Sequence, residues 1–262
     1  MAVRQRPTPV APGQHFLRSS RLAAELVRDA GVEPGGLVVD IGAGTGVLTR
    51  ALVEAGARVL ALEADPALVA ELRRRFAGRR VTVVEADARR WTWPREPFQV
   101  VANLPFAGSG EILSSLLQDP RGGLRSADVI VQWELAAKQA AVWPATMRAT
   151  YWRAWFDVAN VARLARSAFS PPPSVEAGVL RFTRRDRPLV PPGEHDRYRQ
   201  LLAEAFRGQA PLQRALRSRV SPRELRRLAS LLGFDPGSHA RDLDPRQWAA
   251  LFSYARGRQR NT

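Results

Sequence analysis

The feature that most constrains this fold is a glycine-rich turn, Asp40-Ile41-Gly42-Ala43-Gly44-Thr45-Gly46, which follows an apolar run that begins at Gly36. Three glycines between a strand and a helix allow a tight backbone turn and a close approach to a ligand. Apolar runs then alternate with stretches of helical periodicity. This alternation predicts repeated βαβ units, and therefore an α/β fold with a mostly parallel sheet and helices on both faces.

The predicted elements follow one another at short spacing. A first helix begins after Ser19 or Ser20 and ends at Gly31. We predict strands at 36–41, 58–62, 81–85, 98–102 and 129–133, helices at 47–55 and 66–76, and helical stretches between the last two strands and after Glu134. Two later strands, at 156–161 and 177–183, are expected to add an antiparallel edge.

Composition divides the chain into three parts. Residues 1–13 carry three prolines and two arginines without periodicity and predict a flexible basic arm. Residues 14–185 hold the strand and helix alternation, and 186–262 show only helical patterns, near 195–207, 222–232 and 245–256. Positions 181–262 hold 18 arginines and eight acidic residues, so +10 of the net charge of +15 lies there. We therefore predict a small helical domain that binds a polyanion, most simply nucleic acid.

Several classes of protein are excluded or disfavoured. The chain has no cysteine, which excludes disulfides and thiolate metal sites, and its three histidines are widely separated, so we expect no metal. Its one lysine, Lys138, has no phosphate-binding loop around it. No long apolar run and no apolar signal core is present, which favours a cytoplasmic protein without a membrane segment.

Acidic residues stand at the ends of three successive predicted strands. Asp40 precedes Gly42 and Gly44, Glu63 ends the second strand, and Asp87 follows the third. The position that the dinucleotide pattern reserves for a third glycine is Val47, so a smaller, cationic adenosyl ligand fits better than a pyrophosphate. We predict that Asp40 lies beside the cationic group, that Glu63 accepts from the ribose hydroxyls and that Asp87 accepts from the adenine amine.

The fourth strand ends at Asn103-Leu104-Pro105-Phe106. The lone pair of an exocyclic adenine nitrogen is delocalised into the ring, so this amine is a poor nucleophile. Two acceptors on its N–H groups, the Asn103 side-chain oxygen and the Leu104 carbonyl, would favour pyramidalisation. Pro105 fixes the backbone and Phe106 offers a face for an extruded base. The pattern predicts methylation of an adenine amine.

These blocks resemble those of the ribosomal RNA adenine N6-methyltransferases, which include the erythromycin-resistance methylases and the 16S dimethyladenosine transferases. The similarity runs from Gly13-Gln14-His15-Phe16-Leu17 to Phe169-Ser170-Pro171-Pro172-Pro173-Ser174-Val175, in the family's order. The resemblance implies a class I fold that depends on S-adenosylmethionine, Rossmann-like, with a small C-terminal all-α domain. It implies cofactor contacts at Gln14, His15, Leu17, Asp40, Gly42, Gly44, Glu63, Ala64, Asp87, Ala88 and Asn103.

The resemblance also assigns the target pocket. Asn103 resembles the residue that binds the target amine, and Leu104, Pro105 and Phe106 complete that motif. Phe169 resembles the aromatic residue that closes the pocket from the other side. Two positions depart from the pattern: His15 stands where many members have Asn, and Phe106 where Tyr is common.

Within the family, Ala127–Glu134, the arginine-rich tail and Asp242–Trp248 look more like actinobacterial resistance methylases. That similarity implies one adenine of 23S ribosomal RNA as the target, protein-free RNA as the partner, a monomeric enzyme, and resistance to macrolides, lincosamides and streptogramin B. The alternatives are a 16S dimethyltransferase and a nucleic-acid-binding factor without turnover. The tryptophans at 133, 143, 152 and 155 either stack on unpaired bases or pack in the core.

Overall fold

The computed structural model describes residues 14–259, so the predicted basic arm at 1–13 lies outside the described residues. The chain divides into two compact units. Unit 1 extends to Leu116 and includes Gly122–Ala137 and Asn160–Phe182, whereas unit 2 consists of Leu117–Arg121, Lys138–Ala159 and the chain from Thr183 onward. The unit that contains the predicted C-terminal domain therefore also contains two earlier segments.

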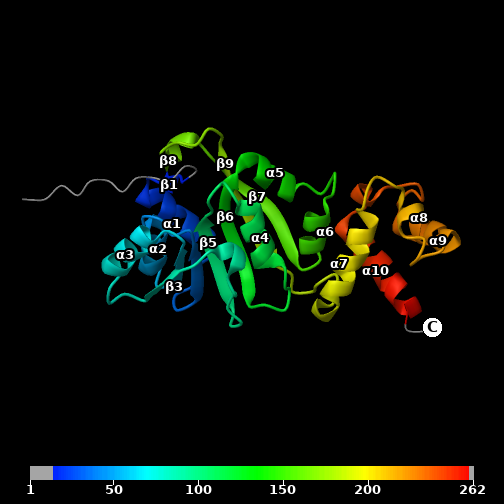
Figure 1. The fold of residues 1–262 in the computed structure, drawn as a ribbon, viewed down its shortest axis with the longest axis horizontal. Helices are drawn as coiled ribbons and strands as arrows, with labels where there is room; N and C mark the ends of the chain where they lie inside the picture. The colour runs from blue at the N-terminus through cyan, green and yellow to red at the C-terminus, as the bar shows by residue number, and fades with distance from the viewer. Residues whose placement is uncertain (1–13, 260–262) are drawn as a thin grey trace, which may run out of the picture. The chain divides into compact units, whose positions relative to one another are not determined.

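A seven-stranded sheet with the strand order β4-β3-β2-β5-β6-β9-β7 forms the framework (Figure 1). The pairs β2–β3, β3–β4, β2–β5 and β5–β6 are parallel, and the sheet ends in an antiparallel edge. The predicted α/β class is confirmed. The strands are β2 (Leu37–Ile41), β3 (Arg58–Glu63), β4 (Val81–Glu85), β5 (Phe98–Asn103), β6 (Leu124–Gln132), β7 (Phe156–Leu164) and β9 (Ala177–Arg184).

The parallel register aligns the carboxyl ends of the strands at one edge. Ile41 of β2 pairs with Leu62 of β3, and Glu63 pairs with Glu85 of β4. Asn103 at the end of β5 pairs with Ile130 of β6. The motifs that follow these strands are therefore neighbours in space, as expected for the ligand crevice of such a sheet.

Helices between the strands begin at residues with the expected capping chemistry. Ser19 Oγ accepts from Leu22 N at 3.1 Å, and the Asp65 carboxylate accepts from Ala67 N at 2.8 Å, with Pro66 as the first helical residue. The helices are α1 (Ser20–Asp29), α2 (Val47–Glu54), α3 (Pro66–Arg75), α4 (Ser109–Leu117) and α5 (Trp133–Ala140). Short 3-10 turns lie at Ala88–Arg90 (η1) and Arg166–Ala168 (η2).

Two short strands were not predicted. β1 (Phe16–Leu17) pairs antiparallel with β8 (Phe169–Ser170), with Leu17 opposite Phe169. Arg18 N extends this pairing by donating to Ala168 O at 3.0 Å. The strand predicted at 129–133 was also wrong at both ends, because β6 begins five residues earlier, at Leu124, and ends at Gln132, directly before Trp133, which begins α5. The two-stranded sheet of β1 and β8 joins the first described residues to the proline-rich turn.

Unit 2 is built from helices around buried aromatic side chains: the Tyr198 ring contacts those of Trp155 and Phe252, and the Trp248 ring stacks on that of Phe206. Within it α6 packs against α7 and α10, and α9 packs against α10. Helix α9 starts at a capping box formed by Ser221 and Glu224. The helices of this unit are α6 (Met147–Arg153), α7 (His195–Ala205), α8 (Leu212–Ala215), α9 (Pro222–Leu232) and α10 (Pro245–Gln259), with 3-10 turns η3 (Pro192–Glu194) and η4 (Ala240–Asp242).

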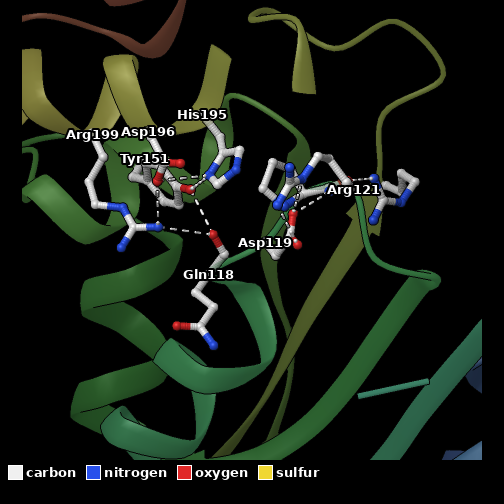
Figure 2. A network of polar contacts seen from close by, with 9 residues as sticks. Gln118, Asp119, Arg121, Tyr151, His195, Asp196 and Arg199 are labelled. Atoms are coloured by element: carbon white, nitrogen blue, oxygen red, sulfur yellow. Dashed lines mark hydrogen bonds and ion pairs between the residues drawn. The ribbon is translucent and has the colours of Figure 1, made fainter. Parts of the chain in front are cut away.

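A polar network fixes the segment Leu117–Arg121 within unit 2 (Figure 2). Tyr151 Oη donates to Gln118 O at 2.7 Å and lies 3.3 Å from His195 Nδ1. Because this hydroxyl proton goes to Gln118, the imidazole donates to the tyrosine oxygen. The contacts explain why a short segment between α4 and β6 belongs to the helical unit.

None of the helices described in the structure combines the length and the apolar character that a membrane-spanning helix requires.

Candidate active site

A cavity of about 300 Å³ lies in unit 1 at the carboxyl ends of β2 to β5. Most of the predicted site residues line it together: Gln14, His15, Gly42, Glu63, Ala64, Asp87, Ala88, Asn103, Leu104 and Pro105. The lining also includes residues that sequence reasoning missed: Phe16, Ile41, Leu62, Ala86, Arg89, Ala107 and Ile112. Two of them had a usable signal, since Phe16 lies inside a recognised block and Arg89 is two residues after Asp87.

Glu63 organises the floor of this cavity. Its Oε1 accepts from the backbone N–H groups of Ala64 (2.8 Å) and Asp65 (3.0 Å), and its Oε2 accepts from Gly44 N at 2.8 Å. The carboxylate is only 7% exposed and still lines the cavity. Three fixed backbone donors orient it, and a carboxylate has about four acceptor positions. It can therefore also accept from a ligand hydroxyl group.

Asp87 lies at the next strand end, but its carboxylate already has a partner. Arg89 Nε lies 2.9 Å and 3.0 Å from its two oxygens, and Arg89 Nη2 lies 2.7 Å from Oδ2. These hydrogen bonds to the guanidinium lower the pKa of Asp87 to about 2. The group stays an acceptor at every physiological pH, and an adenine amine would share it with Arg89.

Asp40 is not beside the cavity, contrary to the expectation that it faces a cationic group. It is 1% exposed, is not among the lining residues, and accepts from Thr49 Oγ1 at 2.6 Å. Burial, opposed by this hydrogen bond and assisted by the charge of Glu63, raises the pKa of Asp40 to about 7. Asp40 instead connects the end of β2 to Thr49 of α2, on the two sides of the glycine turn.

Two other residues assigned to the cofactor also lie behind the lining. Gly44 has a φ of +54°, and an added Cβ would lie 2.6 Å from Phe16 Cε1. Glycine is required there so that Phe16 can pack on the turn. Leu17 is 5% exposed and packs in the main hydrophobic cluster. Since β-strand side chains alternate, Phe16 faces the cavity and Leu17 faces the core.

Asn103 carries the chemistry that the sequence suggests for a target amine. Its Nδ2 donates to His15 O at 2.6 Å, which fixes the amide plane. Its Oδ1 is buried and accepts no hydrogen bond within the described residues. An unsatisfied buried acceptor is costly and uncommon, so this oxygen is prepared for a donor that a ligand brings.

Three aromatic rings, those of His15, Phe106 and Phe169, contact one another in sequence. The His15 and Phe106 ring centroids are 5.3 Å apart, and the Phe106 and Phe169 rings meet edge to face at 6.1 Å. Phe169 is 0% exposed, so in this structure it supports Phe106 and does not line the cavity. Phe106 is half-buried and is not among the cavity-lining residues either.

The tryptophans separate into two groups. Trp152 and Trp155 are 3% and 1% exposed and pack in the core, so stacking on RNA bases is wrong for these two. Trp133 is half-buried beneath the guanidinium of Arg163, whose Cζ lies 4.5 Å from the ring centroid. Trp143 is 58% exposed.

The residues present fit S-adenosylmethionine. Glu63 and Asp87 offer acceptors for the ribose hydroxyls and the adenine amine, and the glycine turn leaves room for the backbone to approach the ligand. The fold and this site define a class I methyltransferase that depends on S-adenosylmethionine. Its bound cofactor supplies a methyl group on an electrophilic sulfonium.

The chain belongs to the ribosomal RNA adenine dimethylase family, whose model matches residues 11–256. It is 35% identical to the mycinamicin-resistance protein MyrB of Micromonospora griseorubida, over 94% of this chain and 80% of that protein. It is 33% identical to ribosomal RNA small subunit methyltransferase A of Thermosynechococcus vestitus, over 95% and 97% of the two chains. It is therefore an rRNA adenine methyltransferase that depends on S-adenosylmethionine.

Among solved structures, the 23S rRNA methyltransferase ErmE superposes with a TM-score of 0.77 at 28% identity, covering 91% of this chain and 98% of ErmE. A dimethyladenosine transferase from Plasmodium falciparum has the same fold, with a TM-score of 0.73 at 20% identity, covering 94% and 98%. Both similarities extend over the helical C-terminal region as well as the sheet.

Proposed function

We propose that this enzyme transfers a methyl group from S-adenosylmethionine to N6 of one adenine in 23S ribosomal RNA, and thereby confers resistance to macrolides, lincosamides and streptogramin B. The observation that carries the chemistry is the unsatisfied Oδ1 of Asn103 at the edge of the cavity. The choice of 23S RNA is supported by the similarity to ErmE and to the resistance protein MyrB.

In this mechanism Asn103 acts as an acceptor for one N–H of the target amine. His15 O holds the other end of the side-chain amide, so Oδ1 cannot be exchanged for Nδ2 by rotation without breaking that bond. The carbonyl of Leu104, the next residue, is the proposed second acceptor. Two acceptors would favour a pyramidal amine. Its nitrogen lone pair would form the new N–C bond to the methyl carbon while the bond from that carbon to sulfur breaks, its electron pair goes to sulfur and a neutral thioether leaves. The amine proton would go to solvent. Positioning and charge placement are then the main contributions of the protein.

The RNA would be held mainly through phosphates by the arginines of unit 2. Helix α9 has three exposed arginines without an ion pair within the described residues: Arg223, Arg226 and Arg227. Phosphate contacts position an RNA without reading its sequence, and the pocket reads one extruded base. A monomer would suffice for this arrangement, because every proposed site residue comes from one chain.

Methyl transfer from labelled S-adenosylmethionine should be measured on protein-free 23S RNA and on 30S particles, with the modified nucleoside identified by mass spectrometry. We expect methyladenosine in the 23S RNA. Label in the 30S particle instead would establish the second candidate, a 16S dimethyltransferase, which the 33% identity to small subunit methyltransferase A favours.

The variant Asn103→Ala tests the site itself. Transfer should fall by about 10²- to 10³-fold, the usual cost of removing one oriented polar group that acts in the transition state. Binding of S-adenosylmethionine should persist. Gln99→Ala is the matched control, because Gln99 lies on the same strand and its amide contacts Ser126 Oγ at 3.2 Å. Comparable methylation by both variants would remove Asn103 from the mechanism.

A further inference from the structure

Trp143 is the one aromatic residue among the large apolar side chains that are exposed in the described part of the chain. It lies in the loop between α5 and α6, within unit 2, and is 58% exposed. The other tryptophans of this region, Trp152 and Trp155, are buried. The loop therefore presents a large flat ring to solvent, and this ring is not part of the buried core of the unit.

This ring is held in place. Its Nε1 donates to Asp242 O at 3.2 Å, and two residues later Ala145 N donates to Arg241 O at 2.9 Å. Both acceptors belong to η4, about a hundred residues further along the chain. The polar edge of the indole is satisfied by the protein, so what remains for a partner is its apolar face. Ordering the ring in advance lowers the entropy cost of binding.

Two arginines without an ion pair in the described residues lie close to Trp143 or to its anchor, besides the carboxylate of Asp242, which accepts from His239 N at 2.7 Å. Arg241 is exposed and directly precedes the residue that anchors the indole, and Arg148 is exposed in the first turn of α6. Neither arginine forms an ion pair within residues 14–259. Other arginines of the unit are neutralised: Arg121 by Asp119 and Arg219 by Glu204. An exposed ring with free guanidinium groups nearby suits a ligand that is both aromatic and anionic.

We propose that Trp143 stacks on an unpaired base of the RNA substrate, with Arg241 contacting a phosphate next to that base. The inference rests on the proposed function, since it concerns how the same RNA is held. Single-stranded nucleic acids bind by this combination of an aromatic platform and a basic surface. A duplex offers no free base face, and one indole is far smaller than the surface that a stable protein dimer buries.

Equilibrium binding of a short single-stranded RNA, and of the duplex of the same sequence, tests the platform. Trp143→Leu keeps an apolar side chain but removes the aromatic face, and should weaken single-strand binding by about 5- to 150-fold. Trp143→Phe should stay within a few-fold of wild type, and duplex binding should be nearly unaffected by either change. Val161→Ala is the control, because Val161 on β7 is 42% exposed, has no ring and lies outside the unit that is proposed to hold the RNA.

Three outcomes would overturn the proposal: single-strand binding by Trp143→Leu equal to wild type, an equal loss with Trp143→Phe, or an equal loss on duplex RNA. Thermal melting of each variant verifies folding. For Arg241→Ala, the slope of log affinity against log salt should become shallower by about one; an unchanged slope removes Arg241 from the contact. If the wild-type enzyme methylates no ribosomal RNA, the proposed function is refuted. If the wild-type enzyme is active but Trp143→Leu binds single-stranded RNA as well as wild type, only the stacking platform is refuted.

Discussion

Asp40→Asn should stabilise this protein, and by an amount that grows with pH. The carboxyl group of Asp40 is buried behind the glycine turn, and its pKa rises from 3.8 to about 7. A native state that holds its proton more tightly than the unfolded state loses stability as pH rises between these two values. Above about pH 7 the loss is complete, since both states are then ionised.

The size follows from the shift. About three pKa units at 1.36 kcal/mol each correspond to about 4 kcal/mol of destabilisation above pH 7. At about pH 5 the unfolded state is already ionised, so roughly 3 kcal/mol of this change falls between pH 5 and pH 8. Asparagine cannot ionise, and its Oδ1 can still accept from Thr49 Oγ1. The stability difference between variant and wild type should therefore increase by about 3 kcal/mol over that interval.

Urea unfolding of both proteins at constant ionic strength, from about pH 5 to about pH 8, measures this difference. Every other ionisable group is present in both proteins, so its contribution cancels in the comparison. Thr49→Val is a useful companion, because it removes the side-chain hydrogen bond that lowers the pKa of Asp40, so the loss of stability should continue to higher pH than in wild type. Parallel stability curves for Asp40→Asn and wild type would show that Asp40 is ionised in the native protein at neutral pH, and would refute the reasoning.

Two further predictions concern the cofactor and the RNA. Gly44→Ala places a Cβ 2.6 Å from Phe16 Cε1 at a φ of +54°, so we expect at least tenfold weaker binding of S-adenosylmethionine, measured by calorimetry. Gly78→Ala is the control: Gly78 has a φ of +72° and open space around it, so this substitution should leave cofactor binding unchanged. Replacing Arg223, Arg226 and Arg227 on α9 by alanine should weaken RNA binding and reduce the salt slope by up to about three, with cofactor affinity unchanged; an unaltered slope would exclude α9 from phosphate contact.

Local chemistry made the core of this fold predictable. The glycine turn, the proline and serine helix starts and the apolar strand runs predicted β2 to β5 and their helices to within a residue or two. The same local rules missed β1 and β8, because a two-residue strand has no periodicity of its own. Its existence depends on a pairing between segments more than 150 residues apart.

Composition placed a domain boundary at 185/186, and it could not reveal which earlier segments belong with the helices that follow. Tyr151 and Trp155 lie in the first two thirds of the chain, yet their rings contact Tyr198 of α7 at 6.3 Å and 5.8 Å. Deleting 186–262 would therefore expose this aromatic core, and would not be a clean test of RNA binding. Substitutions on α9 avoid that problem.

The groups of the candidate site were predictable by type, but their existing partners were not. Glu63 already accepts from three backbone N–H groups, and Asp87 already binds Arg89. A cofactor would therefore share each carboxylate with the partners that it already has. Asn103 differs, since its acceptor oxygen has no partner among the described residues while its amide nitrogen is held by His15 O. His15 in turn contacts Pro171 O through Nδ1 at 2.9 Å. The first described residues thus connect the proline-rich turn to the group that would receive the target amine. A substitution in that turn should consequently impair methyl transfer more than cofactor binding.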